Sequence, residues 1–314
     1  MASLHLLSPL SSRWMKRSLA GVLGGLTLSL SLVSVPAMAG DPFRPEDPHA
    51  IGDATEATFD AMFLEGDYEK TARLVEEAIQ AEPGEPINHA IAAALGYLEG
   101  DWDTLALRAR TTQATAEELL ENDPLRGHLY TAVGIFLQGA YVLQTEGIAR
   151  GTPTALRLLQ QVFAELEAAE EIDPTDPELS LLKGFMDLLL AVNLPFANPD
   201  QAISRLQQGH PPFLAHRGVA IGLRDLKRYD EALVAVNKAL EAAPDNPDLI
   251  YLKAQILRLD GNNSDSLPLY DEALTYADQL PGSIVQQMVF EQCLVQGNAG
   301  AVCSERAESH RASR

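Results

Sequence analysis

Residues 212–246, PFLAHRGVAIGLRDLKRYDEALVAVNKALEAAPDN, and residues 247–279, PDLIYLKAQILRLDGNNSDSLPLYDEALTYADQ, are two consecutive units with the same pattern. In each unit, apolar residues recur at helical spacing in two segments separated by a short polar turn, which predicts a pair of antiparallel helices. From Phe213 to Pro247 the period is 34 residues. A period of this length is typical of stacked repeat proteins, so we expect a stack of helical hairpins.

Alanine occupies the positions where the two helices of a hairpin must approach closely. These alanines are Ala220, Ala232 and Ala239 in the first unit and Ala254 and Ala273 in the second. Small side chains let the helix axes come together, whereas larger ones would push them apart. With this period, these alanines and the closing Pro244, the stretch resembles the tetratricopeptide repeat family. The resemblance implies an architecture, but no reaction and no particular partner.

The same pattern returns near the other end of the chain. Residues 65–86, EGDYEKTARLVEEAIQAEPGEP, match residues 226–247, LKRYDEALVAVNKALEAAPDNP, in the character of each position, with Tyr68 aligned to Tyr229. We therefore expect repeats through nearly all of residues 52–308. The prediction is an all-α, tetratricopeptide-like solenoid of about six helical hairpins, with residues 299–308 as a C-terminal capping helix and a concave groove lined by the first helices.

The middle hairpin is enlarged. Pro83 and Pro174 lie 91 residues apart, which is 23 residues more than two periods. The apolar pattern predicts two long helices at residues 125–146 and 154–172, joined by a loop at 147–153. We call residues 125–172 the middle hairpin.

Residues 1–39 have the features of a signal peptide. A basic region (Arg13, Lys16 and Arg17) precedes an apolar run at residues 19–35, and Ala37 and Ala39 form a cleavage signal. We expect a mature chain that begins at Gly40, with an uncleaved anchor helix as the alternative. The prediction is export to the periplasm, or to a thylakoid lumen if the source is photosynthetic. The mature chain resembles exported acidic tetratricopeptide proteins of cyanobacteria and shows no further membrane span.

The segments on either side of the repeats lack a helical period. Residues 40–51 carry three prolines and predict a flexible leader, and residues 309–314 predict a frayed polar tail. The two cysteines, Cys293 and Cys303, both lie in the part expected to be exported. In an oxidising compartment we expect them to form a disulfide that holds the last helix on the stack, with two free buried thiols as the alternative.

The charge of the chain argues against several classes of partner. The formal net charge is −21, and removal of three cationic residues with the signal peptide would leave −21 − 3 = −24. A charge of this size disfavours nonspecific binding to nucleic acid and to anionic membrane surfaces.

No motif for catalysis or metal binding is evident. The sequence lacks a glycine-rich phosphate loop, a Gly-x-Ser-x-Gly elbow and a His-Glu-x-x-His pair. His210 and His216 come nearest to a metal pair, but no cysteine or close carboxylate completes a ligand set. Residues 260–271 resemble the start of a calcium loop, but Asp265 replaces its glycine and Asp271 its final glutamate, which favours a polar turn. We therefore predict no enzyme activity, no cofactor and no resident metal.

The resemblance implies a binding face. In the tetratricopeptide family, positions two, five, nine and twelve of each first helix line the concave groove. In the two units quoted above these residues are Leu214, Arg217, Ile221 and Arg224, followed by Asp248, Tyr251, Gln255 and Arg258. Three arginines beside Tyr251 and Gln255 reverse the local charge of an acidic chain, so we expect an acidic peptide, a C-terminal carboxylate or another anion to bind there.

These arginines have an alternative interpretation. Instead of binding an anionic ligand, they would pair with charged groups on neighbouring helices. In the N-terminal part of the groove, Asp53, Glu56 and Asp60 would form an acidic entrance.

The leading functional hypothesis is an exported, non-enzymatic scaffold that binds a protein or peptide in the groove. The alternative is a structural or assembly factor that self-associates into a homo-oligomer through the middle hairpin, where Gly134 and Gly139 allow close packing. An enzyme with a site in the groove would need a constellation that the sequence does not show.

Overall fold

A computed structural model describes residues 40–193 and 198–312, which all belong to one structural unit, Met38–Arg314. The predicted signal peptide, part of the segment between residues 193 and 199, and the last two residues lie outside the described residues. Within the described residues, no helix is long and apolar enough to cross a membrane.

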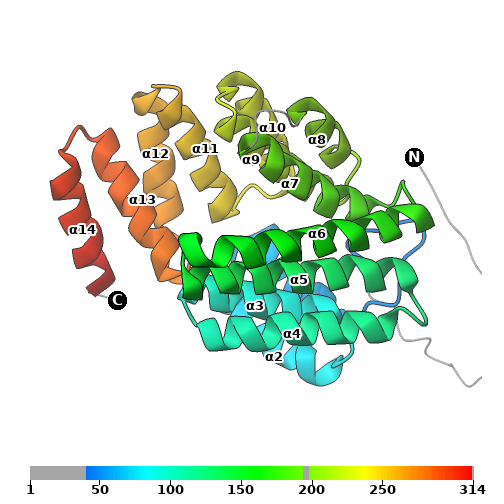
Figure 1. The fold of residues 1–314 in the computed structure, drawn as a ribbon. Coiled ribbons are helices and arrows are strands. Elements are labelled where there is room, and N and C mark those ends of the chain that lie inside the picture. The colour runs from blue at the N-terminus through cyan, green and yellow to red at the C-terminus, as the bar shows by residue number, and fades with distance from the viewer. Residues whose placement is uncertain (1–39, 194–197, 313–314) are drawn as a thin grey trace, which may run out of the picture. The chain divides into compact units, whose positions relative to one another are not determined.

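The described part of the chain folds into helices alone (Figure 1). The elements are α1 (Asp53–Phe59), the π-helical turn η1 (Asp60–Glu65), α2 (Tyr68–Ala81), α3 (Pro86–Glu99), α4 (Trp102–Leu119), α5 (Pro124–Glu146), α6 (Ile148–Ile172), α7 (Pro177–Asn193), α8 (Pro199–Leu206), α9 (Pro212–Asp225), α10 (Tyr229–Ala242), α11 (Pro247–Leu259), α12 (Asn263–Leu274), the 3-10 turn η2 (Ala277–Gln279), α13 (Gly282–Val295) and α14 (Gly300–Ala312).

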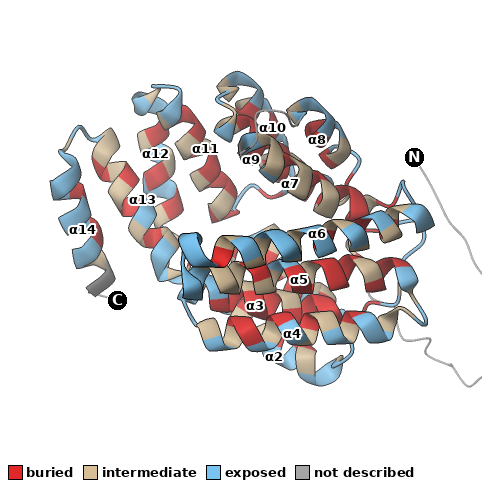
Figure 2. Cartoon of the chain, viewed as in Figure 1, coloured by how far each residue is buried: buried red, intermediate tan, exposed pale blue. Residues whose placement is uncertain are grey.

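Consecutive helices pack as hairpins, from the pair α1 and α2 to the pair α13 and α14. The all-α, tetratricopeptide-like fold predicted from the repeat pattern is confirmed. The predicted capping helix at residues 299–308 corresponds to α14. It packs against α13, so the two helices form a further hairpin. Figure 2 shows that buried residues concentrate on α3 and α5, whereas exposed residues cover much of α6.

Local sequence signals explain where the helices begin. Asn246 and Asp123 each precede a proline at the first helical position, and their side chains accept hydrogen bonds from the backbone amides of Leu249 and Arg126. Such caps satisfy amides that have no partner within the helix, and the missing amide of proline costs nothing at this position.

The connection within the middle hairpin is shorter than predicted. Gly147 alone separates α5 from α6, and residues 148–153 belong to α6 instead of the expected loop. Gly147 has a φ of 76° and reverses the chain direction. Pro153 lies in the second turn of α6, where its missing amide removes a single hydrogen bond, so the helix continues through it.

Residues 40–51 are not the flexible leader that their prolines predict. Asp41, Phe43, Arg44 and Ile51 are all buried. The Nε atom of Arg44 donates to Oδ2 of Asp176 at 2.6 Å, 132 residues later in the chain. The leader is therefore fixed to α7 by buried ion pairs, which local composition cannot reveal. At the other end, residues 309–312 also differ from the prediction, because they continue α14.

Glycine explains the close contact between α4 and α5. A Cβ atom added at Gly134 would lie 2.7 Å from the backbone nitrogen of Gln113. Alanine at this position would push the helices apart. Gly134 therefore serves the packing of the stack.

Candidate functional site

The predicted groove residues lie on two neighbouring first helices. Arg217 and Arg224 belong to α9, and Tyr251, Gln255 and Arg258 belong to α11. Their spacing of three, four or seven residues puts the side chains of each helix on one face.

Four of these five residues meet in one cavity of about 360 Å³, which we call the polar cavity. Its lining residues are Tyr68, Leu98, Arg217, Ile221, Arg224, Asp248, Tyr251, Leu252, Gln255, Ser283, Ile284 and Gln287. Arg258 is not among them. Two arginines and one aspartate give the lining a formal charge of +1, in a chain whose net charge is −21.

Internal partners satisfy two of the three arginines. Arg224 donates from Nε to Oδ1 of Asp225 at 2.8 Å and from Nη1 to Oε1 of Gln255 at 2.7 Å. Arg258 donates from Nε to the hydroxyl of Tyr270 at 3.2 Å, and its Nη2 atom lies 3.5 Å from a carboxylate oxygen of Glu291. The alternative that groove charges pair with neighbouring helices fits Arg258, whose partners lie on α12 and α13, whereas the charged partner of Arg224 is Asp225 on its own helix.

Arg217 is held more loosely. Within the described residues, its partner is Asp248, with Nη2 and Oδ2 3.6 Å apart. That Asp248 oxygen also accepts a hydrogen bond from the hydroxyl of Tyr68. The side chain of Arg217 is 28% exposed. A guanidinium carries five N–H donors, so Arg217 keeps capacity for a further anionic group.

Helices from the N-terminal part of the chain form one wall of the polar cavity. Asn246 donates from Nδ2 to the carbonyl oxygens of Phe63 and Leu64, at 3.0 Å each. Ser283 donates from Oγ to the carbonyl of Leu98 at 3.1 Å. These contacts join η1 and α3 to segments more than 180 residues later. The predicted concave groove, where α9 and α11 line it, is therefore partly covered by the same chain.

The wall residues Tyr68, Leu98 and Ser283 were not predicted. The sequence aligns Tyr68 with Tyr229 as a packing residue and gives no sign of its contact with Asp248. The repeat pattern describes contacts between neighbouring hairpins alone.

A second cavity of about 260 Å³, which we call the apolar cavity, is also lined by Arg217. It is lined by Phe43, Phe59, Phe63, Ile87, Ala90, Ile91, Ala94, Tyr130, Val133, Leu137, Glu178, Leu181, Leu182, Phe185, Leu214 and Arg217. These residues come from the leader, η1 and the helices α1, α3, α5, α7 and α9. Arg217 is the one residue shared by the linings of the two cavities.

A buried ion network closes one side of the apolar cavity. The carboxylate of Glu178 lies 3.0 Å from Nη2 of Arg44 and accepts a hydrogen bond from the hydroxyl of Tyr130. Burial raises the pKa of Glu178, and the charges of Arg44 and Arg126 oppose this rise. Arg126 also pairs with both carboxylate oxygens of Glu85. The network links the leader to α3, α5 and α7.

The acidic entrance predicted from Asp53, Glu56 and Asp60 is not part of either cavity. Burial and the charges of Glu56 and Glu65 raise the pKa of Asp60.

The other sequence candidates have structural roles. Asn262 caps α12 by accepting from the amide of Asp265, so the calcium-like segment is a helix start. Within the described residues, no three histidine, cysteine or acidic side chains are placed to hold a metal ion.

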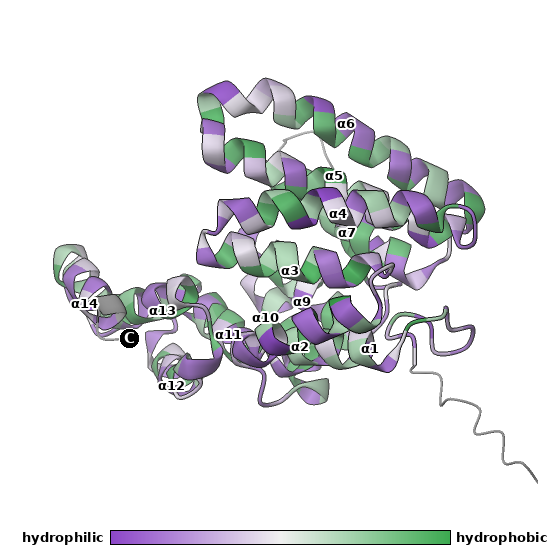
Figure 3. Cartoon of the chain, turned by 90° about the horizontal axis from the view of Figure 1, so that it is seen from below, coloured by the Kyte–Doolittle hydropathy of each residue, from purple (hydrophilic) through white to green (hydrophobic). Residues whose placement is uncertain are grey.

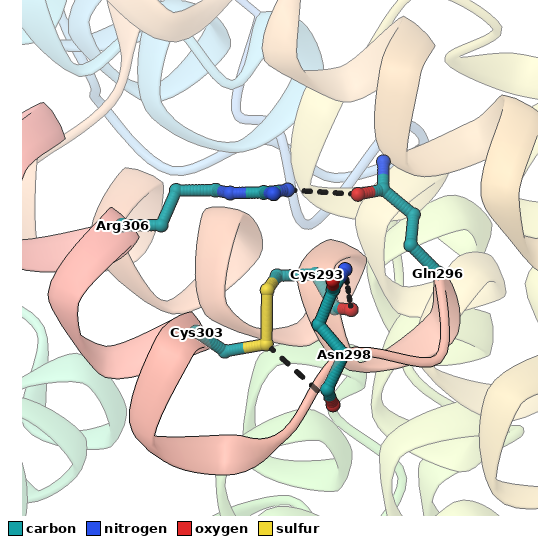
Figure 4. Close-up of a disulfide and its surroundings, with 5 residues drawn as sticks. All are labelled: Cys293, Gln296, Asn298, Cys303 and Arg306. Atoms are coloured by element: carbon teal, nitrogen blue, oxygen red, sulfur yellow. Dashed lines mark hydrogen bonds between the residues drawn. A yellow bond between two sulfur atoms is a disulfide. The ribbon is translucent and has the colours of Figure 1, made fainter.

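The two cysteines form a disulfide in the structure (Figure 4). It joins α13 to α14 with a Cα–Cα distance of 5.4 Å, and both cysteines are fully buried. Nearby, Asn298 donates to the carbonyl of Cys293 at 3.1 Å, and Arg306 donates to Gln296 at 2.7 Å. The bridge fixes the last helix on the stack.

No protein-family model and no curated protein matches the chain. Among solved structures, the chain is similar to TTC0263, a thermophilic TPR protein in Thermus thermophilus. The two share 24% identity over 65% of this chain and 97% of that chain, with a TM-score of 0.45. The present chain is also similar to the TPR2AB-domain:pHSP90-complex of yeast Sti1. The identity is 15% over 81% of this chain and 97% of that chain, and the TM-score is 0.29.

Proposed function

We propose that this chain is a non-enzymatic scaffold that binds a protein or peptide partner at the polar cavity. The observation that carries the proposal is the meeting of Arg217, Arg224, Tyr251 and Gln255 around one space. Guanidinium groups bind carboxylates by paired hydrogen bonds, so the partner presents an acidic segment or a C-terminus.

Arg217 is the residue on which this binding depends. Arg224 already donates to Asp225 and Gln255, whereas Arg217 has a single contact at 3.6 Å in the described structure. A partner carboxylate at Arg217 would compete with Asp248, which keeps its hydrogen bond from Tyr68.

A crosslinking pull-down from envelope extract tests the proposal. The bait is the chain from residue 40 to residue 314, beside the variants Arg217→Glu and Arg73→Glu. Arg73 is a matched control because its side chain is 63% exposed and it lies on α2, outside both cavities. The native bait and Arg73→Glu should capture the same partner, and Arg217→Glu should lose it. Equal capture by all three baits would contradict a site at the polar cavity.

A second candidate function, self-association through the middle hairpin, has its own supporting observation. Residues 135–143 of α5, residues 152–162 of α6 and Leu189 of α7 line a cavity of about 330 Å³, which we call the hairpin cavity. Figure 3 shows apolar (green) and polar (purple) residues interleaved along α6. Around the hairpin cavity, Phe136 is 39% exposed, Leu189 is 47% exposed and Leu156 is 55% exposed. Exposed apolar groups gathered in this way are typical of interaction surfaces.

Light scattering on the chain from residue 40 to residue 314 tests this second function. The variant Leu156→Glu should shift a dimer or larger assembly to the monomer, because a charge in an apolar interface is costly. Leu107→Glu on α4 is the matched control, since Leu107 is 56% exposed and does not line the hairpin cavity. A native chain that scatters as a monomer at all concentrations tested would rule self-association out.

A further inference from the structure

The apolar cavity has the lining of a site for a hydrocarbon chain. All of its lining residues except Glu178 and Arg217 are apolar or aromatic. Its volume of about 260 Å³ exceeds that of an engineered apolar cavity that binds benzene, about 150 Å³. A water molecule occupies about 30 Å³ in the liquid, and a methylene group is of similar size, so this space holds on the order of nine carbon atoms.

The two charged residues of the lining differ in what they can still bind. Glu178 is fully buried, and Arg44 and Tyr130 already contact its carboxylate. It therefore takes no part in holding a ligand. Within the described residues, Arg217 has its loose contact with Asp248 and lies at the boundary between the apolar cavity and the polar cavity.

The lining of the apolar cavity determines which kind of ligand fits. The apolar part of the ligand must fill the space lined by side chains such as Val133, Leu182 and Phe185. The anionic group of the ligand must reach the guanidinium of Arg217. The polar cavity, which Arg217 also lines, leaves room for the hydrated side of that group.

We propose that the apolar cavity binds the chain of an amphipathic carboxylate of about eight to ten carbon atoms, with its carboxylate on Arg217. The ligand class is a medium-chain fatty acid. This inference goes beyond the proposed function, because no protein partner is needed for it. A peptide with an apolar C-terminal residue is a different ligand, and the experiment below separates the two.

Isothermal titration calorimetry of the chain from residue 40 to residue 314 with a series of straight-chain fatty acid salts is the direct test. From hexanoate to decanoate, each added methylene should tighten binding about fourfold, because it buries more apolar surface. The gain should stop near nine or ten carbons, when the cavity is full. Decanol should bind about tenfold more weakly than decanoate, since it lacks the charge that Arg217 recognises.

Two pairs of variants locate the site. Arg217→Gln should weaken decanoate binding at least about tenfold, whereas Arg73→Gln should leave it unchanged. Ala94→Phe should fill the apolar cavity and weaken decanoate binding, whereas Ala140→Phe, the same change in the lining of the hairpin cavity, should not. Thermal unfolding of each variant shows whether it is folded.

Absence of saturable decanoate binding by the native chain would overturn the inference. So would binding that survives both Arg217→Gln and Ala94→Phe, or that is lost in Ala140→Phe. Binding of an apolar C-terminal peptide without any binding of decanoate would assign the cavity to a peptide and also overturn it. If decanoate fails to bind while Arg217→Glu still abolishes partner capture, the proposed function stands without this inference.

Discussion

Arg126 is a buried charged side chain in the N-terminal half of the chain. It is 2% exposed, pairs with both oxygens of Glu85, lies near Glu178 and stacks over the ring of Tyr130 at 5.3 Å. Removing one partner of a buried ion pair leaves the other charge without compensation.

We predict that Arg126→Met lowers the free energy of unfolding by about 3–5 kcal/mol, as measured by urea denaturation. Arg73→Met, a change at a 63% exposed position, should stay within about 0.5 kcal/mol of the native chain. A loss below about 1 kcal/mol in Arg126→Met would show that the network contributes little.

Glu170 gives the stability a dependence on pH. Hydrogen bonds from Lys183, then from Arg205, lower the pKa of its carboxyl below the ordinary value of 4.5. A lowered carboxyl pKa in the folded state stabilises the protein above the unfolded pKa, and this contribution disappears as the pH falls through the folded value.

The variant Glu170→Gln should therefore be less stable than the native chain near about pH 7, by less than about 1 kcal/mol because the site is solvent-accessible. The difference should shrink as the pH falls below the ordinary carboxyl pKa and through the lowered pKa of Glu170. Urea midpoints measured across this range check it, with Glu167→Gln on the exposed side of α6 as the charge control. A difference that persists unchanged at low pH would exclude the ion pairs as its cause.

At the scale of elements, the last helix depends on the disulfide. Within the described residues, α14 packs chiefly on α13, and Cys293 and Cys303 join them. Closing a loop of about ten residues removes entropy from the unfolded chain and stabilises the fold by about 2–3 kcal/mol.

We predict that Cys293→Ser with Cys303→Ser lowers the free energy of unfolding by about 2–3 kcal/mol and raises the hydrogen exchange of α14 amides most strongly. Amides of α5 should change little, because that helix packs mainly on α3, α4 and α6 and not on α13 or α14. Equal exchange in α14 with and without the bridge would contradict the pinning role.

A comparison of the helices with the sequence predictions shows which features the sequence pattern predicts. The 34-residue period and its alanines predicted the helices α9 to α12. Four of the groove residues that the tetratricopeptide resemblance implies line one cavity. The pattern gave wrong predictions at residues 40–51 and 148–153, because prolines were taken there as signs of a loop. Residues 40–51 are instead held in place by the buried contact of Arg44 with Asp176. Residues 148–153 are helical, because Pro153 lies early in α6. The contact of Tyr68 with Asp248 has no local signal at all.

At the scale of the whole molecule, export remains a prediction from residues 1–39. When the full chain is expressed in a bacterium, N-terminal sequencing of the periplasmic protein should give Gly40 as its first residue, and Ala39→Leu should accumulate the uncleaved precursor. Protein found only in the cytoplasm with its first residues intact would contradict export.

Repeat arrays are usually modular, since each hairpin contacts only its neighbours and copies can be added or lost one at a time. The hydrogen bonds of Asn246 with Phe63 and Leu64, and of Ser283 with Leu98, remove that freedom here. Inserting or deleting a single hairpin between them would shift one set of partners away from the other. We therefore expect the insertion or deletion of a whole hairpin to destabilise this chain more than changes at its surface.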